Sequence, residues 1–239
     1  MNLLEIKNLT KNFGGLTAVS NLSFQLNKGE ILGLIGPNGA GKTTAFNLIT
    51  GFIKPTSGKI FFENKNITNN NTHSIVKKGI ARTFQIVKPF RNLTVLENVI
   101  LGVFLKVSNR LVATKEAFNI LEKVNLTKKA NSYASDLTLG EQKRLEIARC
   151  LGTKPKVLFL DEPMGGLNPS EIDNACNLVK KLKDTGISII LVEHHMKAIM
   201  KISDKVIVLQ HGIKIAEDVP EKITKNKTVI KAYLGGELL

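Results

Sequence analysis

The sequence predicts an α/β protein with a mainly parallel sheet, an antiparallel β flap and an inserted helical subdomain. Short apolar runs alternate with helical patterns, which is typical of buried parallel strands joined by helices. Residues 86–152, in contrast, carry only helical patterns. We therefore expect the 239 residues to form one domain, with a helical subdomain at about 86–152. The buried runs are Glu30–Ile35, Val157–Leu160 and Ile187–Val192.

The N-terminal third predicts the flap. Leu3–Leu9 and Leu16–Leu26 alternate apolar and polar residues, as half-buried antiparallel strands do. After the first buried run we expect a strand at Lys59–Phe62, an exposed polar loop at 64–71 and a strand at 80–85.

Helix boundaries are marked by capping residues. Thr94 and Glu97 form a capping box that begins a helix toward Phe104, and another helix is expected to begin near Thr138 or Gly140. Further expected elements are a helix from Pro169 to about Thr185, a hairpin at 205–217, and a helical, exposed tail at 220–239.

Composition excludes some functions. No apolar run approaches the roughly 18 residues of a membrane span, and the N-terminus lacks the pattern of a secretory signal. The net charge of +14 is scattered along the chain. With no Trp and only two Tyr, the chain lacks a base-stacking platform, so we expect no nucleic-acid partner.

One motif predicts nucleotide binding. It follows the first buried strand, precedes a helical pattern and fits the phosphate-binding loop at every position. Backbone N–H groups can curl around an anion there, Lys42 can reach the β- and γ-phosphates, and the Thr43 hydroxyl can hold Mg²⁺. A simple glycine-rich turn would not need the Lys-Thr pair. The motif is Gly36-Pro37-Asn38-Gly39-Ala40-Gly41-Lys42-Thr43-Thr44.

Polar residues at other strand ends predict hydrolysis. Asp161 and Glu162 follow a buried strand, where Asp161 can hold Mg²⁺ through water and Glu162 can orient the attacking water. The alternative is a solvated pair of helix-capping acids. His194 can donate a hydrogen bond to the leaving phosphate, and Gln85 can contact Mg²⁺ or the water. Phe13 either packs a turn or stacks on adenine.

A second anion-binding helix start lies at Leu137–Gln142, where a small residue and a glycine allow close backbone approach. It needs no phosphate of its own if it meets the γ-phosphate held by a second subunit.

The order of these motifs resembles that of the ATP-binding-cassette (ABC) ATPases over essentially the whole chain. The resemblance implies a P-loop NTPase core that binds ATP and Mg²⁺, with Lys42, Glu162 and His194 acting in hydrolysis. It also implies that Phe13 stacks on adenine and that Gln85 links the γ-phosphate to the helical subdomain. The residues that would complete a partner's site are Thr138, Gly140 and Glu141.

Two segments depart from the family pattern. The signature usually reads Leu-Ser-Gly-Gly-Gln, and here it is Leu137-Thr138-Leu139-Gly140-Glu141. The loop after the acid pair usually ends Leu-Asp, and here it ends Leu167-Asn168.

A closer resemblance is to the branched-chain amino-acid (Liv-type) importer ATPases, in particular the longer of the two. It is carried by Gly79–Gln85, Phe90–Asn98, Arg144–Cys150, Gly166–Pro169, Glu193–Lys197 and the ending Ala232–Gly235. It implies a second ATPase subunit, two membrane permease subunits, a solute-binding protein acting indirectly, and a place on the cytoplasmic face of the membrane. Branched-chain amino acids, amides or urea are the implied solutes. The alternatives are a lipid or export cassette, and a soluble ABC ATPase acting on nucleic acid or in assembly.

Overall fold

An antiparallel four-stranded sheet forms the N-terminal flap. The computed structural model describes residues 2–234. The strands of this sheet are β1 (Asn2–Phe13), β2 (Leu16–Asn27), β4 (Ser57–Phe62) and β5 (Lys65–Asn66), in the order β2-β1-β4-β5. The predicted flap is confirmed, but part of the expected loop at 64–71 is strand β5. Glu63 and Asn64 both have positive φ, which is the backbone of a tight two-residue hairpin turn.

The second sheet is six-stranded and mainly parallel, as predicted. Its strands are β3 (Ile31–Ile35), β6 (Ile80–Arg82), β7 (Val157–Asp161), β8 (Ser188–Val192), β9 (Lys205–Gln210) and β10 (Ile213–Asp218). Their order is β10-β9-β3-β8-β7-β6, and only the β9–β10 hairpin is antiparallel among these pairs. The expected strand at 80–85 ends early, because the Phe84 N–H donates to the Glu146 side chain instead of to a neighbouring strand.

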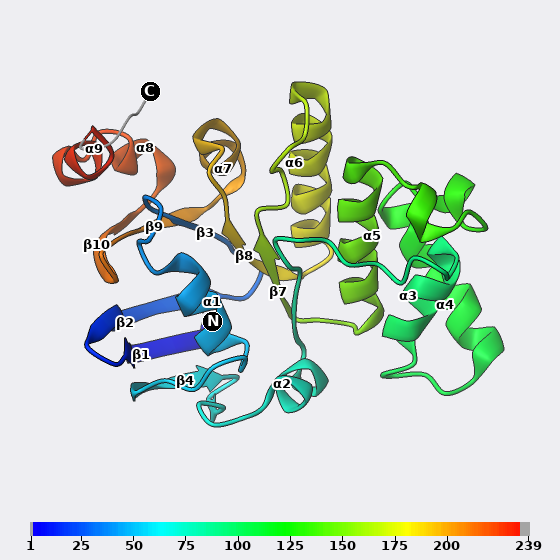
Figure 1. Ribbon diagram of the computed structural model, residues 1–239, viewed down its shortest axis with the longest axis horizontal. Helices are drawn as coiled ribbons and strands as arrows, with labels where there is room; N and C mark the ends of the chain where they lie inside the picture. The colour runs from blue at the N-terminus through cyan, green and yellow to red at the C-terminus, as the bar shows by residue number, and fades with distance from the viewer. Residues whose placement is uncertain (1, 235–239) are drawn as a thin grey trace.

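Both faces of the parallel sheet are buried. Along β3, Ile31 and Ile35 point into one apolar cluster while Leu32 and Leu34 point into another. The flap, α1 (Lys42–Ile49) and α2 (Thr72–Lys78) cover the Leu32 face. The Ile31 face lies under α5 (Leu139–Gly152), α6 (Pro169–Asp184) and α7 (Met196–Ile202). Figure 1 shows α1 between the two sheets.

The chain between β6 and β7 forms helices at one end of the molecule (Figure 1). They are α3 (Val95–Val103), α4 (Arg110–Lys123) and α5, with short 3-10 turns η1 (Thr127–Lys129) and η2 (Ala134–Asp136). Thr94 caps α3 with the predicted capping box. Glycine lets α3 and α5 approach closely, because a Cβ on Gly102 would lie 2.4 Å from the Arg149 carbonyl oxygen.

The C-terminal segment forms α8 (Pro220–Ile223) and α9 (Lys227–Leu234). The segment is helical, as expected, and most of its described residues are exposed, but Pro220, Ile223 and Val229 are buried against the core. Burial also raises the pKa of the Tyr233 hydroxyl to about 12, and a hydrogen bond with the Gly36 backbone opposes that shift. The part of the expected tail at 235–239 lies outside the described residues.

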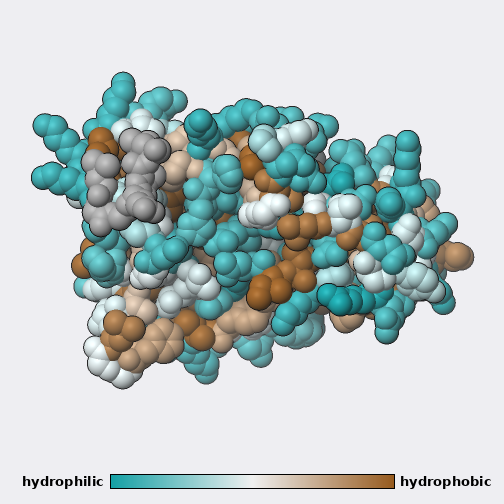
Figure 2. All heavy atoms as spheres, turned by 45° about the horizontal axis from the view of Figure 1, so that its top comes forward, coloured by the Kyte–Doolittle hydropathy of each residue, from teal (hydrophilic) through white to brown (hydrophobic). Residues whose placement is uncertain are grey.

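The face seen in Figure 2 is mostly hydrophilic, and apolar side chains gather at its lower left and towards its centre. Among residues 2–234, no helix combines the length and the hydropathy that a membrane crossing requires.

Candidate functional site

The carboxyl ends of four neighbouring parallel strands converge on one edge of the sheet. β3 leads into the phosphate loop, while β6, β7 and β8 lead toward Gln85, Glu162 and His194. A cleft of about 530 Å³ lies there, a size typical of small-molecule sites. The predicted residues that line it are Phe13, Asn38, Gly39, Ala40, Gly41, Lys42, Thr43, Thr44, Gln85, Glu162 and His194.

The phosphate loop needs its glycines. Gly36 has a φ of 151° and Gly41 a φ of 97°, and Gly41 is the residue that precedes the first turn of α1. A Cβ on Gly36 would lie 2.2 Å from the Leu209 carbonyl oxygen, and one on Gly41 would lie 2.4 Å from that of Ala18. The backbone thus packs against β9 and β2 so closely that a side chain would displace it.

Lys42 is held on the inner side of this loop. Its ammonium donates hydrogen bonds to the carbonyls of Gly36 at 2.6 Å and Pro37 at 2.9 Å. Burial lowers the pKa of Lys42, and the carboxylates of Glu162 and Asp161 oppose that shift. A buried cation beside backbone N–H groups at a helix start favours a polyanionic ligand.

Gln85, Glu162 and His194 form one hydrogen-bonded group at the cleft wall. The Gln85 amide donates to Glu162 Oε2 at 3.1 Å, and His194 Nε2 lies 2.9 Å from Glu162 Oε1. Both carboxylate oxygens of Glu162 therefore have a partner from a different strand end. Glu162 itself has a φ of 49°, a left-handed conformation that is uncommon for a residue with a side chain.

Asp161 lies behind the cleft wall. It is 4% exposed, and the guanidinium of Arg82 donates to its Oδ2 at 3.0 Å. Burial raises the pKa of Asp161, and Arg82 opposes the shift. Arg82 also donates to Asn47 Oδ1 at 2.6 Å, which joins β6, β7 and α1 behind the phosphate loop.

Phe13 ends β1 at the mouth of the cleft. Its ring is 49% exposed, and the Lys11 ammonium lies 5.0 Å from the ring centroid. Phe13 lines the same cleft as the phosphate loop.

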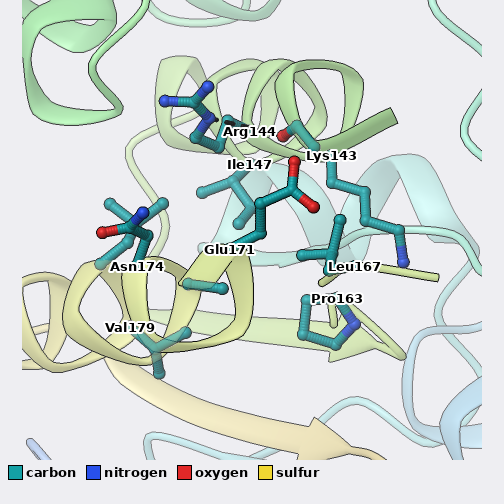
Figure 3. A pocket seen from close by; sticks show the side chains of 11 residues that line it. Lys143, Arg144, Ile147, Pro163, Leu167, Glu171, Asn174 and Val179 are labelled. Atoms are coloured by element: carbon teal, nitrogen blue, oxygen red, sulfur yellow. Dashed lines mark hydrogen bonds between the residues drawn. The ribbon is translucent and has the colours of Figure 1, made fainter. Parts of the chain in front are cut away.

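The signature residues do not line this cleft. Thr138 caps α5, and the Glu141 carboxylate accepts a hydrogen bond from the Thr138 backbone at 2.9 Å. This capping box gives a local reason for Glu141 at a position where the family has Gln. Gly140 lines a different, smaller pocket between α5 and α6, shown in Figure 3.

Sequence reasoning did not assign a role to three buried charged residues next to the site. These residues are Arg82, Lys143 and Glu146. Lys143 and Glu146 are 9% and 7% exposed on the inner side of α5. Helix α5 is buried on two faces: Lys143 and Glu146 lie with Ile147 on a face away from Leu145 and Ala148, so a single apolar stripe does not mark them.

Family comparisons agree with this geometry. Residues 19–165 match the family model described as "ABC transporter", and residues 214–238 match "Branched-chain amino acid ATP-binding cassette transporter". The chain is 44% identical to the high-affinity branched-chain amino acid transport ATP-binding protein LivG of Salmonella typhimurium, and the alignment covers 98% of each protein.

Solved structures of ATP-binding cassettes have the same fold. One is a nucleotide-free ATP-binding cassette from an ABC transporter, with a TM-score of 0.90, 35% identity, and coverage of 99% of this chain and 100% of that one. Another is a dimeric cassette in a post-hydrolysis state with ADP and Pi, with a TM-score of 0.82, 28% identity, and coverage of 91% and 99%. The chain therefore belongs to the family of ABC transporter ATPases that bind and hydrolyse ATP.

Proposed function

We propose that this chain powers an importer of branched-chain amino acids or related small solutes such as amides and urea. The observation that carries the proposal is the cleft where the phosphate loop, Gln85, Glu162 and His194 meet, in a chain 44% identical to LivG over nearly its full length. All 239 residues would act as one nucleotide-binding unit, in which residues 86–152 form the helical subdomain.

Each residue of the cleft has a defined task in this proposal. Lys42 and the loop N–H groups bind the phosphates, and Phe13 stacks on adenine. Glu162 accepts a hydrogen bond from the attacking water and orients it toward the γ-phosphate. His194 donates to the phosphate that leaves, and its contact with Glu162 at 2.9 Å holds both side chains at the same edge of the cleft.

The donor set suits Mg²⁺. The Thr43 hydroxyl and the Gln85 amide oxygen are hard oxygen ligands on the cleft wall, and Mg²⁺ prefers such ligands together with phosphate oxygens and water. Asp161 would act through water, since Arg82 already holds its Oδ2. When bound, Mg²⁺ neutralises charge on the β- and γ-phosphates.

The site is completed by a second ATPase subunit, identical or related. Thr138, Gly140 and Glu141 do not line the cleft of their own chain, so in this proposal they contact the γ-phosphate held by the partner. The dimeric cassette with ADP and Pi supports this arrangement, because its fold matches that of this chain.

The membrane partners would dock near residues 85–98. Ile86 and Phe90 are 70% and 49% exposed there, and the adjacent Phe84 is 46% exposed, which is a high exposure for large apolar side chains. Cytoplasmic loops of two permease subunits would cover them and hold the chain at the cytoplasmic face of the membrane. The solute-binding protein would act through the permeases, and no nucleic acid would take part.

Co-purification from membranes tests this assignment. We expect the tagged chain to bring down two permease subunits, and an Ile86→Glu variant to lose them while retaining ATP binding. ATPase activity stimulated by nucleic acid, without recovery of permeases, would contradict the importer assignment. Recovery of permeases of a lipid or export system would instead assign the chain to that class of transporter.

Replacing Phe13 by Ala should weaken ATP binding about tenfold, because stacking on one base contributes roughly 1–3 kcal/mol. A nucleotide titration measures the change. Phe61→Ala is the matched control, since the Lys7 ammonium lies 5.2 Å from the Phe61 ring but Phe61 lies outside the cleft. Equal affinities of the parent and Phe13→Ala for ATP would show that Phe13 only packs the turn.

A further inference from the structure

Two charged side chains of α5 are buried against the loops that carry the hydrolytic residues. Lys143 and Glu146 are three positions apart, so they lie on one face of the helix. Burying a charge is costly unless a polar partner compensates it. The partners that these two side chains contact therefore indicate what the buried charges do.

Lys143 reaches the backbone of the proposed water-orienting residue. Figure 3 shows its side chain leaving α5 and running beside the pocket toward the segment that carries Pro163. The Lys143 ammonium donates to the carbonyl oxygen of Glu162 at 2.6 Å. Burial lowers the pKa of Lys143, while Glu193, Glu146 and Glu162 oppose the shift and favour the charged form.

Glu162 needs such support. A non-glycine residue with a φ of 49° is strained and persists only where its surroundings fix it. Its N–H donates to the Val192 carbonyl at 2.9 Å, and its carbonyl accepts from Gly165 at 3.2 Å and from Lys143 at 2.6 Å. The bond from Lys143 is the shortest of these three, and it comes from another element of the fold.

Glu146 holds the neighbouring strand end in the same way. Its Oε1 accepts a hydrogen bond from the Phe84 N–H at 2.8 Å. Phe84 directly precedes Gln85, whose amide contacts Glu162 at 3.1 Å. The segment that carries Gln85 and the segment that carries Glu162 therefore each form a hydrogen bond with the same turn of α5.

We infer that Lys143 and Glu146 are positioning residues that together set the orientation of Glu162 and Gln85 for ATP hydrolysis. This inference rests on the proposed function of that site. Because α5 begins at the signature residues Thr138–Glu141, a shift of the helix would move both hydrolytic loops together. The helix that contacts the partner's nucleotide thus also orients the hydrolytic groups of its own chain.

Lys143→Met and Glu146→Met test the inference, because Met keeps most of the side-chain volume but removes the donor or acceptor. We expect kcat for ATP hydrolysis to fall about 10- to 100-fold in each, since small displacements of reacting groups have effects of that size. KM for ATP should change less than about twofold, because neither side chain lines the nucleotide cleft. Lys143→Arg and Glu146→Gln keep a donor and an acceptor and should recover most of the activity.

The midpoint of thermal unfolding separates positioning from a general structural role. Removing one partner of a buried polar contact is destabilising, so we expect each Met variant to unfold at a lower temperature than the parent but to remain folded at the temperature of the assay. Lys154→Met is the matched control, because its surface pair with Glu116 at 3.0 Å lies away from the cleft.

Two results would overturn the inference while leaving the proposed function intact. One is parental kcat in both Met variants. The other is a loss of kcat that comes with an equal rise in KM or with unfolding of the variant at the temperature of the assay. If the parent chain itself hydrolyses no ATP, the proposed function fails, and this inference fails with it.

Discussion

Replacing Glu162 by Gln is expected to reduce kcat for ATP hydrolysis about 100-fold or more while ATP still binds. Gln keeps the size of the side chain and one oxygen that can accept from the Gln85 amide, but it cannot accept a proton from the attacking water, and general-base catalysis contributes typically 10²–10⁴-fold. Single-turnover hydrolysis and a nucleotide titration on the same preparation measure the two effects separately.

The matched control is Glu116→Gln, which makes the same change at a surface ion pair with Lys154. It should leave both turnover and ATP affinity unchanged. Parental turnover in Glu162→Gln would mean that another group orients the water. A loss of ATP binding in Glu162→Gln would mean that the substitution disturbs the phosphate loop.

Replacing Lys42 by Ala is expected to weaken ATP binding at least about 100-fold. Hydrogen bonds to charged groups contribute about 1.5–3 kcal/mol each, and Lys42 would contact two phosphates. The variant also leaves the carbonyls of Gly36 and Pro37 without the ammonium that links them. Both effects act on affinity, so a titration with ATP measures them directly.

Lys201→Ala serves as the control for Lys42→Ala, since Lys201 forms an exposed ion pair with Asp173 at 2.7 Å. Surface pairs of this kind contribute little, so ATP affinity should stay at the parental value. ATP binding by Lys42→Ala with parental affinity would place the triphosphate somewhere other than the phosphate loop.

The fold class was predictable because its signals are local. The apolar runs that form β3, β7 and β8 are short and buried on both faces, and periodicity identifies such strands without any long-range information. Capping boxes at Thr94 and Asn168 likewise begin helices where the sequence predicted them. The predictions were wrong where a residue distant in sequence determines the backbone hydrogen bonding. Phe84 is an example, because its N–H donates to Glu146 of α5 and the strand ends before it.

The residues of the candidate site likewise divide into those that local sequence signals predicted and those that depend on distant partners. Gln85, Glu162 and His194 each follow a strand, so the parallel order of the sheet was enough to bring them to one edge. Arg82 was missed because its role depends on the pair with Asp161, which is 79 positions away in sequence. Lys143 was missed for a similar reason, since its partner is a backbone carbonyl that no side-chain motif marks.

In the proposed function, ATP hydrolysis at Glu162 drives solute uptake. The most direct test is uptake of labelled leucine by vesicles that contain this chain, its co-purified permeases and the solute-binding protein. The importer assignment predicts uptake that requires ATP and that falls to background with Glu162→Gln. Uptake at the parental rate with Glu162→Gln would contradict it.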